Sequence, residues 1–400
     1  MHQTIRCLRT LTGAGLLAAA AAPALAADPG VFDDRIVIGS VLPQTGPPSL
    51  IGKASVIALR VWEKDVNARG GIHGRKIDLR VEEDAYVPQR SVQALKKLID
   101  VDKVFAVLGT SGSSHLLAMM PTIEENQIPA LNFAAVAGAH FTPPRKTVFN
   151  VGATYCQEID GVMKHLITTR KLQGATFGII YQDDDYGADV KCGYDMALKT
   201  LGLSSTVAVA YKRGAKDLSA EVLAVQRAGA TFVLTGGIIS ETATMLKEIQ
   251  KNGMNVVRLA PHPSHLGAVL ALAGSAAEGL LLADYVPPIT DTQTQGIGRL
   301  NALAYKYLSA DEVKAMNRYS LTATVAAQLL ESAITACGRN LTRDCLVQKL
   351  EQTKNFGSDG IMAPLTFGPG IRQSGTRPIL LKANTATGQF ERASEFLSDK

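Results

Sequence analysis

The sequence lacks the signatures of several classes of protein. Its 400 residues include 41 Lys and Arg against 36 Asp and Glu, and the formal net charge of +5 is spread along the chain without a basic block. No stretch interleaves aromatic with basic residues, so the electrostatic footprint of nucleic-acid binding is missing. Neither a Cys-x-x-Cys pair nor a His/Cys cluster is present. We therefore expect no metal site, no cofactor and no nucleic-acid partner.

Catalytic motifs are missing as well. Residues 109–114 (GTSGSS) come close to a nucleophile elbow, but Ser113 stands where the G-x-S-x-G pattern needs its second glycine. No Gly-Lys-Ser/Thr follows a glycine-rich loop, which excludes a phosphate-binding loop. We expect that the chain is not an enzyme. A secreted hydrolase that uses Ser113 or His262 is a remote alternative, because no base and orienting acid are recognisable beside them.

The apolar run nearest the N-terminus is short. It covers residues 11–22, follows the basic residues Arg6 and Arg9, and precedes the small-residue segment 23–26 (PALA). A helix that crosses a bilayer takes about 20 apolar residues, so this pattern is typical of a cleaved signal peptide. We expect residues 1–26 to be removed and the mature protein to reach the periplasm. A buried N-terminal helix is the alternative.

Cysteine is scarce, with five in the chain. The four that follow the expected signal peptide are Cys156, Cys192, Cys337 and Cys345. An even number permits disulfides in an oxidising compartment. Cys337 and Cys345 flank a Gly-Arg-Asn turn, which makes them the preferred pair. Four buried free thiols are the alternative.

Short β-rich runs alternate with amphipathic stretches along most of the chain. Six strands are expected, at 36–42, 77–81, 104–108, 177–181, 232–235 and 257–259. Each is followed by an expected helix, at 49–68, at 88–101, and from residues 113, 186, 240 and 264. This rhythm predicts an α/β protein with parallel sheets covered by helices on both faces, and the length predicts two such sheets.

Ligands of open parallel sheets bind at the carboxyl ends of the strands, where the loops lead into helices. The loop at 109–114 is one of these. Its helix-start amides and the hydroxyls of Ser113 and Ser114 would suit a carboxylate, and Ser113 is expected to cap the helix. A plain N-cap without ligand contact is the alternative.

Some residues of other loops allow both a structural and a functional interpretation. The acidic turn 183–185 favours a helix N-terminus over a Ca²⁺ or acid–base site, whereas the ring of Tyr186 could cover a ligand. His262 and His265 are expected to be satisfied loop histidines.

Several segments together resemble the leucine/isoleucine/valine-binding proteins of branched-chain amino acid ABC importers. The resemblance covers essentially the whole mature chain. Its most specific features are the GGIxGRK turn, the D-x-Y-G helix entry and the AEG(L) strand, and the matching segments are IVIGSVLPQTGPPSLIGK, NARGGIHGRKIDLRVEEDAYVPQRSV, VFAVLGTSGSSHLLAMMP, IPALNFAAVAG, DDDYGAD, AEGLLLADYVPP and MAPLTFGPG.

The resemblance implies a type I periplasmic binding fold, a Venus flytrap of two doubly wound lobes joined by three crossings near residues 152, 285 and 363. The first lobe would combine residues 34–152 with 285–362, and the second 153–284 with 363–400. The implied partners are a small-molecule ligand, an inner-membrane ABC permease and its ATPase, and the protein is expected to be a monomer.

Family members hold an amino acid between the lobes, and the resemblance transfers that site position by position. Ser113, Ser114, Ala134 and Tyr186 match, and Tyr319 stands where the family often has an aromatic wall. Four positions differ from the family: its threonine falls on Val136, its acidic ammonium partner on His262, and two of its tyrosines on Ile51 and Ile238.

The changed positions alter the expected ligand. Histidine cannot supply the negative charge that a buried ammonium group needs, although Glu241 could restore it. We therefore expect a small hydrophobic carboxylate, such as an aromatic or branched aliphatic acid, in preference to a free amino acid. A sensory module of the same fold is the alternative to a transport protein.

Overall fold

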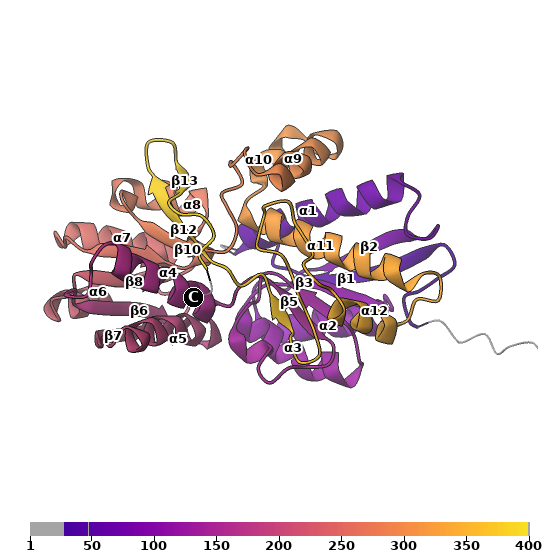
Figure 1. Ribbon diagram of the computed structural model, residues 1–400, viewed down its shortest axis with the longest axis horizontal. Coiled ribbons are helices and arrows are strands. Elements are labelled where there is room, and N and C mark those ends of the chain that lie inside the picture. Colours follow the sequence, from indigo (N-terminus) through magenta and orange to yellow (C-terminus); the bar gives the residue numbers. More distant parts are fainter. Residues whose placement is uncertain (1–27, 47, 399–400) are drawn as a thin grey trace, which may run out of the picture.

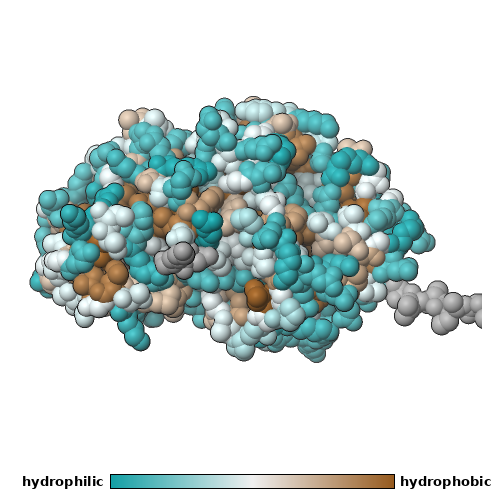
Figure 2. Space-filling model, viewed as in Figure 1, coloured by the Kyte–Doolittle hydropathy of each residue, from teal (hydrophilic) through white to brown (hydrophobic). Residues whose placement is uncertain are grey.

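The structure, a computed structural model, describes residues 28–46 and 48–398. The expected signal peptide at 1–26 lies outside them. Two separate sheets form, each with helices around it, as the alternating pattern predicts (Figure 1). None of the helices within the described ranges is long and apolar enough to cross a membrane. On the face shown in Figure 2, apolar residues occur in small groups among hydrophilic ones.

The first sheet has six strands in the order β11-β5-β4-β3-β1-β2, all parallel. Its strands are β1 (Arg35–Val41), β2 (Lys76–Glu82), β3 (Ala106–Thr110), β4 (Ala130–Asn132), β5 (Val148–Val151) and β11 (Gln373–Ser374). The helices of this lobe are α1 (Ser49–Ala68), α2 (Pro88–Asp100), α3 (Ser113–Glu125), η1 (Gly138–His140), α9 (Gln295–Tyr307), α10 (Ala310–Ala315), α11 (Arg318–Cys337) and α12 (Arg343–Glu351).

The second sheet has seven strands in the order β13-β12-β10-β9-β8-β6-β7, parallel except for the antiparallel pairs at the β12 and β13 edge. Its strands are β6 (Phe177–Gln182), β7 (Ser205–Tyr211), β8 (Phe232–Gly236), β9 (Val257–Ala260), β10 (Leu281–Asp284), β12 (Ile379–Asn384) and β13 (Gln389–Arg392). Its helices are α4 (Tyr155–Thr169), α5 (Asp185–Thr200), α6 (Ser219–Arg227), α7 (Ser240–Lys251), η2 (His262–Ser264), α8 (Gly267–Ala273) and η3 (Gly274–Ala277).

Both lobes are doubly wound because alternate residues of each central strand point to opposite faces. In β1, Ile36 and Ile38 pack in the cluster that contains α1 and α11, whereas Val37 and Val41 pack with α2 and α3. The helix expected from residue 264 starts at Gly267, since residues 262–264 form the short turn η2.

The chain passes between the sheets three times. It leaves the first sheet after β5 and the second after β10, close to residues 152 and 285. The third passage was expected near residue 363. That expectation is wrong, because Gln373 and Ser374 pair in parallel with β5, so the chain crosses between β11 and β12.

The four cysteines form two disulfides. Cys337 is joined to Cys345, the pair that the sequence spacing favours. Cys156 in α4 is joined to Cys192 in α5, a pairing that the sequence leaves open. The second disulfide links the two helices that begin on either side of the candidate site.

Candidate functional site

Loops at the carboxyl ends of both sheets meet around a small cavity with a free volume of about 10 Å³, here called the inner cavity. Its lining residues come from both lobes and are Ile51, Tyr86, Ser111, Gly112, Ser113, Ala134, Tyr155, Tyr186, Ile238, Pro263 and Tyr319. Six of the ten residues expected at the site are among them. The topology places them together because the strands that precede these loops end at the same edge of each sheet.

Ser113 reaches the cavity at the start of α3. The N-cap of this helix is Gly112, with a φ of 94°, and no side chain caps the helix. The expectation that Ser113 caps the helix is therefore wrong: it is the first helical residue, and its buried Oγ has no hydrogen-bond partner among the described residues. Its hydroxyl and the unpaired amides of this helix end are thus available to an acceptor.

Four tyrosine rings dominate the rest of the lining. The Tyr186 hydroxyl donates to the Gly237 carbonyl at 2.8 Å. Within the described part of the chain, the hydroxyls of Tyr86, Tyr155 and Tyr319 have no such partner. Burial raises the pKa of all three phenols, so each stays protonated near neutral pH and can donate a hydrogen bond.

A tight turn from β6 into α5 positions Tyr186. Asp184 is the N-cap of α5 and accepts a hydrogen bond from the Gly187 amide at 3.1 Å. A side chain at Gly187 would meet the Gln182 carbonyl oxygen, which lies 1.7 Å from the place of its Cβ. The acidic turn therefore serves as a helix start, as expected.

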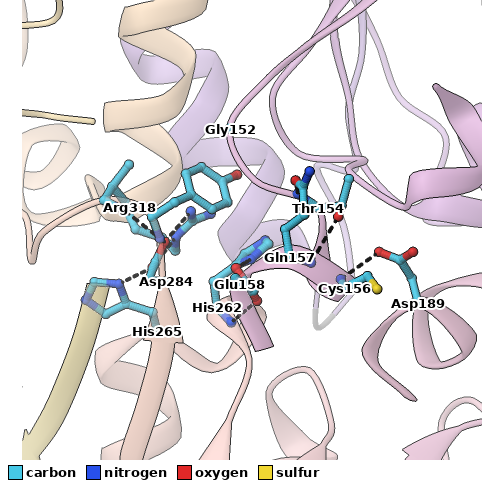
Figure 3. A network of polar contacts seen from close by, with 12 residues as sticks. Gly152, Thr154, Cys156, Gln157, Glu158, Asp189, His262, His265, Asp284 and Arg318 are labelled. Atoms are coloured by element: carbon cyan, nitrogen blue, oxygen red, sulfur yellow. Dashed lines mark hydrogen bonds and ion pairs between the residues drawn. The ribbon is translucent and has the colours of Figure 1, made fainter. Parts of the chain in front are cut away.

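His262 is close to the cavity but does not line it. Its ring stacks on Tyr155 with centroids 4.8 Å apart, and its Nδ1 lies 2.7 Å from Glu158 Oε2 (Figure 3). Both side chains are fully buried. Burial raises the pKa of Glu158 and lowers that of His262, so burial favours the uncharged form of both groups.

A second buried group lies beside this pair. Asp284, at the end of β10, binds Arg318 of α11 through two contacts of 2.8 Å and His265 through one of 2.6 Å. Burial alone would raise the pKa of Asp284, but the Arg318 guanidinium and His265 outweigh it and hold that pKa well below its usual range. Arg318 in turn lies under the ring of Tyr319, 4.6 Å from its centroid.

The remaining expected residues lie around the cavity. Ser114 points to the second lobe, where its Oγ accepts a hydrogen bond from Arg213 Nη2 at 3.2 Å. Val136 is fully buried in the core and does not reach the cavity. Glu241 accepts from the Ser240 hydroxyl and lines a larger cavity at the mouth of the cleft.

Sequence reasoning missed Tyr86, Tyr155 and Glu158. The spacing of Tyr155 and Glu158 places them on neighbouring positions of the first turn of α4, which starts directly after the first crossing. The position of these residues could have predicted that they lie at the site, because helices that start near a crossing face the cleft. Nothing in the local sequence shows that Glu158 meets a loop 104 residues further on.

The comparison with known proteins agrees with this geometry. The sequence model of the periplasmic binding protein family matches residues 35–381. A Leu/Ile/Val-binding protein homologue of Brucella suis is 29% identical over 252 residues, which are 62% of this chain and 61% of the relative. This chain thus matches less than two thirds of that relative's length. The leucine-specific-binding protein of Salmonella typhimurium is 25% identical over 344 residues, 86% of this chain and 89% of the relative.

Among solved structures, a fatty acid ABC transporter substrate-binding protein from Thermomonospora curvata superposes with a TM-score of 0.82 at 24% identity, covering 93% of this chain and 95% of that one. Such a likeness shows the fold, a type I periplasmic binding protein. Since the family match spans residues 35–381 of the 400, this protein belongs to the periplasmic binding protein family and is similar to its leucine/isoleucine/valine-binding members.

Proposed function

We propose that this chain captures a small hydrophobic carboxylate in the inner cavity and delivers it, as a periplasmic monomer, to an ABC permease and its ATPase. The observation that carries the proposal is the chemistry of the lining. Ser113 and three tyrosines offer hydroxyl donors without partners, and no acidic side chain lines the inner cavity among the described residues.

The donors suit an anion or another acceptor. A carboxylate at the start of α3 would meet the Ser113 hydroxyl, the free amides of the helix end and the favourable end of its dipole. Ile51, Ile238 and the tyrosine rings would cover an apolar body. Charge-assisted hydrogen bonds of this kind contribute roughly 1.5–3 kcal/mol each.

An α-ammonium group finds no such compensation here. Glu158, a buried acid beside the cavity, contacts His262 at 2.7 Å, and burial raises the pKa of Glu158, which favours its uncharged form. A buried ammonium without a counter-charge is costly. The names of similar proteins refer to both amino acids and fatty acids, so the lining residues are the better guide to the ligand.

Calorimetric titration of matched pairs tests the ligand class. Isocaproate and hydrocinnamate should bind, whereas leucine and phenylalanine, which differ from them by the ammonium group, should bind at least tenfold more weakly. Tight binding of the amino acids without binding of the deaminated acids would refute the proposal. A radiolabelled acid that binds should also enter wild-type cells and not cells without the gene, a result that a purely sensory role does not produce.

A further inference from the structure

A second cavity with a free volume of about 510 Å³, here called the outer cavity, opens to solvent at the mouth of the cleft. The first lobe contributes Pro48, Ala85 and Tyr86 to its wall, and the second contributes Ile238, Ile239 and Ala215. Most of this wall is therefore apolar. An apolar hollow that both lobes complete is the kind of surface that binds part of a ligand.

The outer cavity adjoins the inner one, because Tyr86 and Ile238 line both. The Tyr86 ring is fixed on two sides: it packs on His115 with centroids 4.3 Å apart, and the Arg213 guanidinium of the other lobe lies 5.5 Å from its centroid. The Tyr86 backbone is held in the left-handed region, with a φ of 57°, and its amide donates to Asp84 at 2.9 Å. A rigid ring thus stands at the boundary between the two cavities.

The inner cavity alone is small. Its free volume of about 10 Å³ lies far below the roughly 300–1,000 Å³ of ordinary ligand pockets. A carboxylate headed toward Ser113 would leave the far end of any longer body at Tyr86 and Ile238. Arg213, Lys216 and Glu241 also line the outer cavity, and its apolar residues provide the surface for that end.

We propose that the outer cavity is a second subsite, which holds the apolar tail of an elongated carboxylic acid whose head lies in the inner cavity. This inference rests on the proposed function and narrows its substrate class to acids with an extended hydrocarbon tail. Gln182 lines the same cavity, and its buried Oε1 has no hydrogen-bond partner among the described residues.

The test is a calorimetric titration of the full mature chain with butanoate, hexanoate, octanoate and decanoate. Affinity should rise along the series by about fourfold for each methylene that enters the outer cavity, the equivalent of about 0.8 kcal/mol per buried CH₂. Two variants fill the outer cavity from different elements without touching the inner one: Ala215→Trp and Thr244→Trp. Each should remove the gain of decanoate over butanoate and leave butanoate binding unchanged.

The matched control is Ala268→Trp, in a third cavity on another side of the cleft that is lined by Leu50, His265 and Met316. It should leave the whole series unchanged. The melting temperature of each variant shows whether it is folded, and one folded filling variant is enough for the comparison.

Four outcomes would overturn the inference. Affinity that does not grow along the series, or filling variants that weaken butanoate and decanoate equally, would show that the outer cavity holds no tail, while the proposed function stands. Loss of the gain in Ala268→Trp instead would place the tail in the third cavity. If no acid of the series binds to the wild type, the proposed function fails together with this inference.

Discussion

Arg318 of the first lobe and Asp284 of the second form a two-contact ion pair in which neither side chain is exposed to solvent. The pair stands directly behind the cavity wall, since Arg318 underlies the ring of Tyr319. It also joins the end of β10, which directly precedes the second crossing, to the start of α11 in the other lobe. The lobes are therefore connected here by a buried charge pair as well as by the chain.

Removal of one partner of this pair should be costly. Arg318→Met leaves Asp284 buried without its main counter-charge, and we expect a loss of about 3–5 kcal/mol in the free energy of unfolding. Urea denaturation monitored by circular dichroism measures it. Arg69→Met is the control, because Arg69 pairs with Asp65 and Glu331 while half exposed, and it should cost no more than about 1 kcal/mol. Equal losses in the two variants would contradict this account.

Arg213 connects the lobes at the mouth of the cleft. It reaches from the second lobe to Ser114 Oγ at 3.2 Å while it is paired with Asp184 of its own lobe. Arg213→Gln should weaken the closed form by about 1 kcal/mol and so speed ligand release about fivefold. Stopped-flow measurement with a carboxylate that binds would show this. Lys212→Gln, which removes a pair within the second lobe only, should leave the release rate unchanged. Equal rates in the two variants would rule out this role of Arg213.

Ser113 and Ser114 should behave differently although they are neighbours. Ser113→Ala removes a hydroxyl that has no protein partner, so the unliganded protein should keep its stability within about 0.5 kcal/mol. Binding of a carboxylate should weaken by about 1–3 kcal/mol, because a hydrogen bond to a charged group is lost. Ser114→Ala should lose only the contact with Arg213. Thermal melts with and without ligand distinguish the two, and a large loss for unliganded Ser113→Ala would contradict the free hydroxyl.

His140 makes stability depend on pH. Its Nε2 lies 2.9 Å from the Ser113 carbonyl, and burial lowers the pKa of its ring to about 4. Below its ordinary pKa of 6.5 the unfolded chain gains a proton that the folded chain does not, so stability falls as the pH drops from about 6.5 to 4. His140→Asn should flatten the stability profile in this window, whereas the exposed His73→Asn should not. An unchanged slope in His140→Asn would refute this.

Asp189 changes the stability with pH in the opposite direction to His140. The stability profiles of the His140 and Asp189 variants must therefore be compared with each other. Burial raises its pKa from 3.8 to about 6, although the amides of Gly138 and Cys156 donate to it. The folded state therefore keeps the proton longer than the unfolded chain does. Stability falls as the pH rises from about 3.8 to 6, and Asp189→Asn should remove this component. Urea denaturation across this pH range would show it, and an unchanged slope would contradict the raised pKa.

The sequence by itself determined the class of fold and much of the candidate site. Hydrophobic periodicity is local, so the helix Ser49–Ala68 and the start of α3 at Ser113 agree with the structure. The rule that loops at the carboxyl ends of parallel strands meet at one edge brought Ser113, Tyr186 and Ile238 to the same cavity.

Tertiary structure alone decided which buried charged groups lie beside that cavity. Glu158 and His262 are 104 residues apart, and only the docking of α4 against the loop after β9 brings them into contact and favours the uncharged form of the acid. The same holds for Arg318 and Asp284 and for the late third crossing, which depends on a two-residue strand too short to show periodicity. Such features depend on which distant surfaces pack together and on the burial that results, and neither is written in any local pattern of the chain.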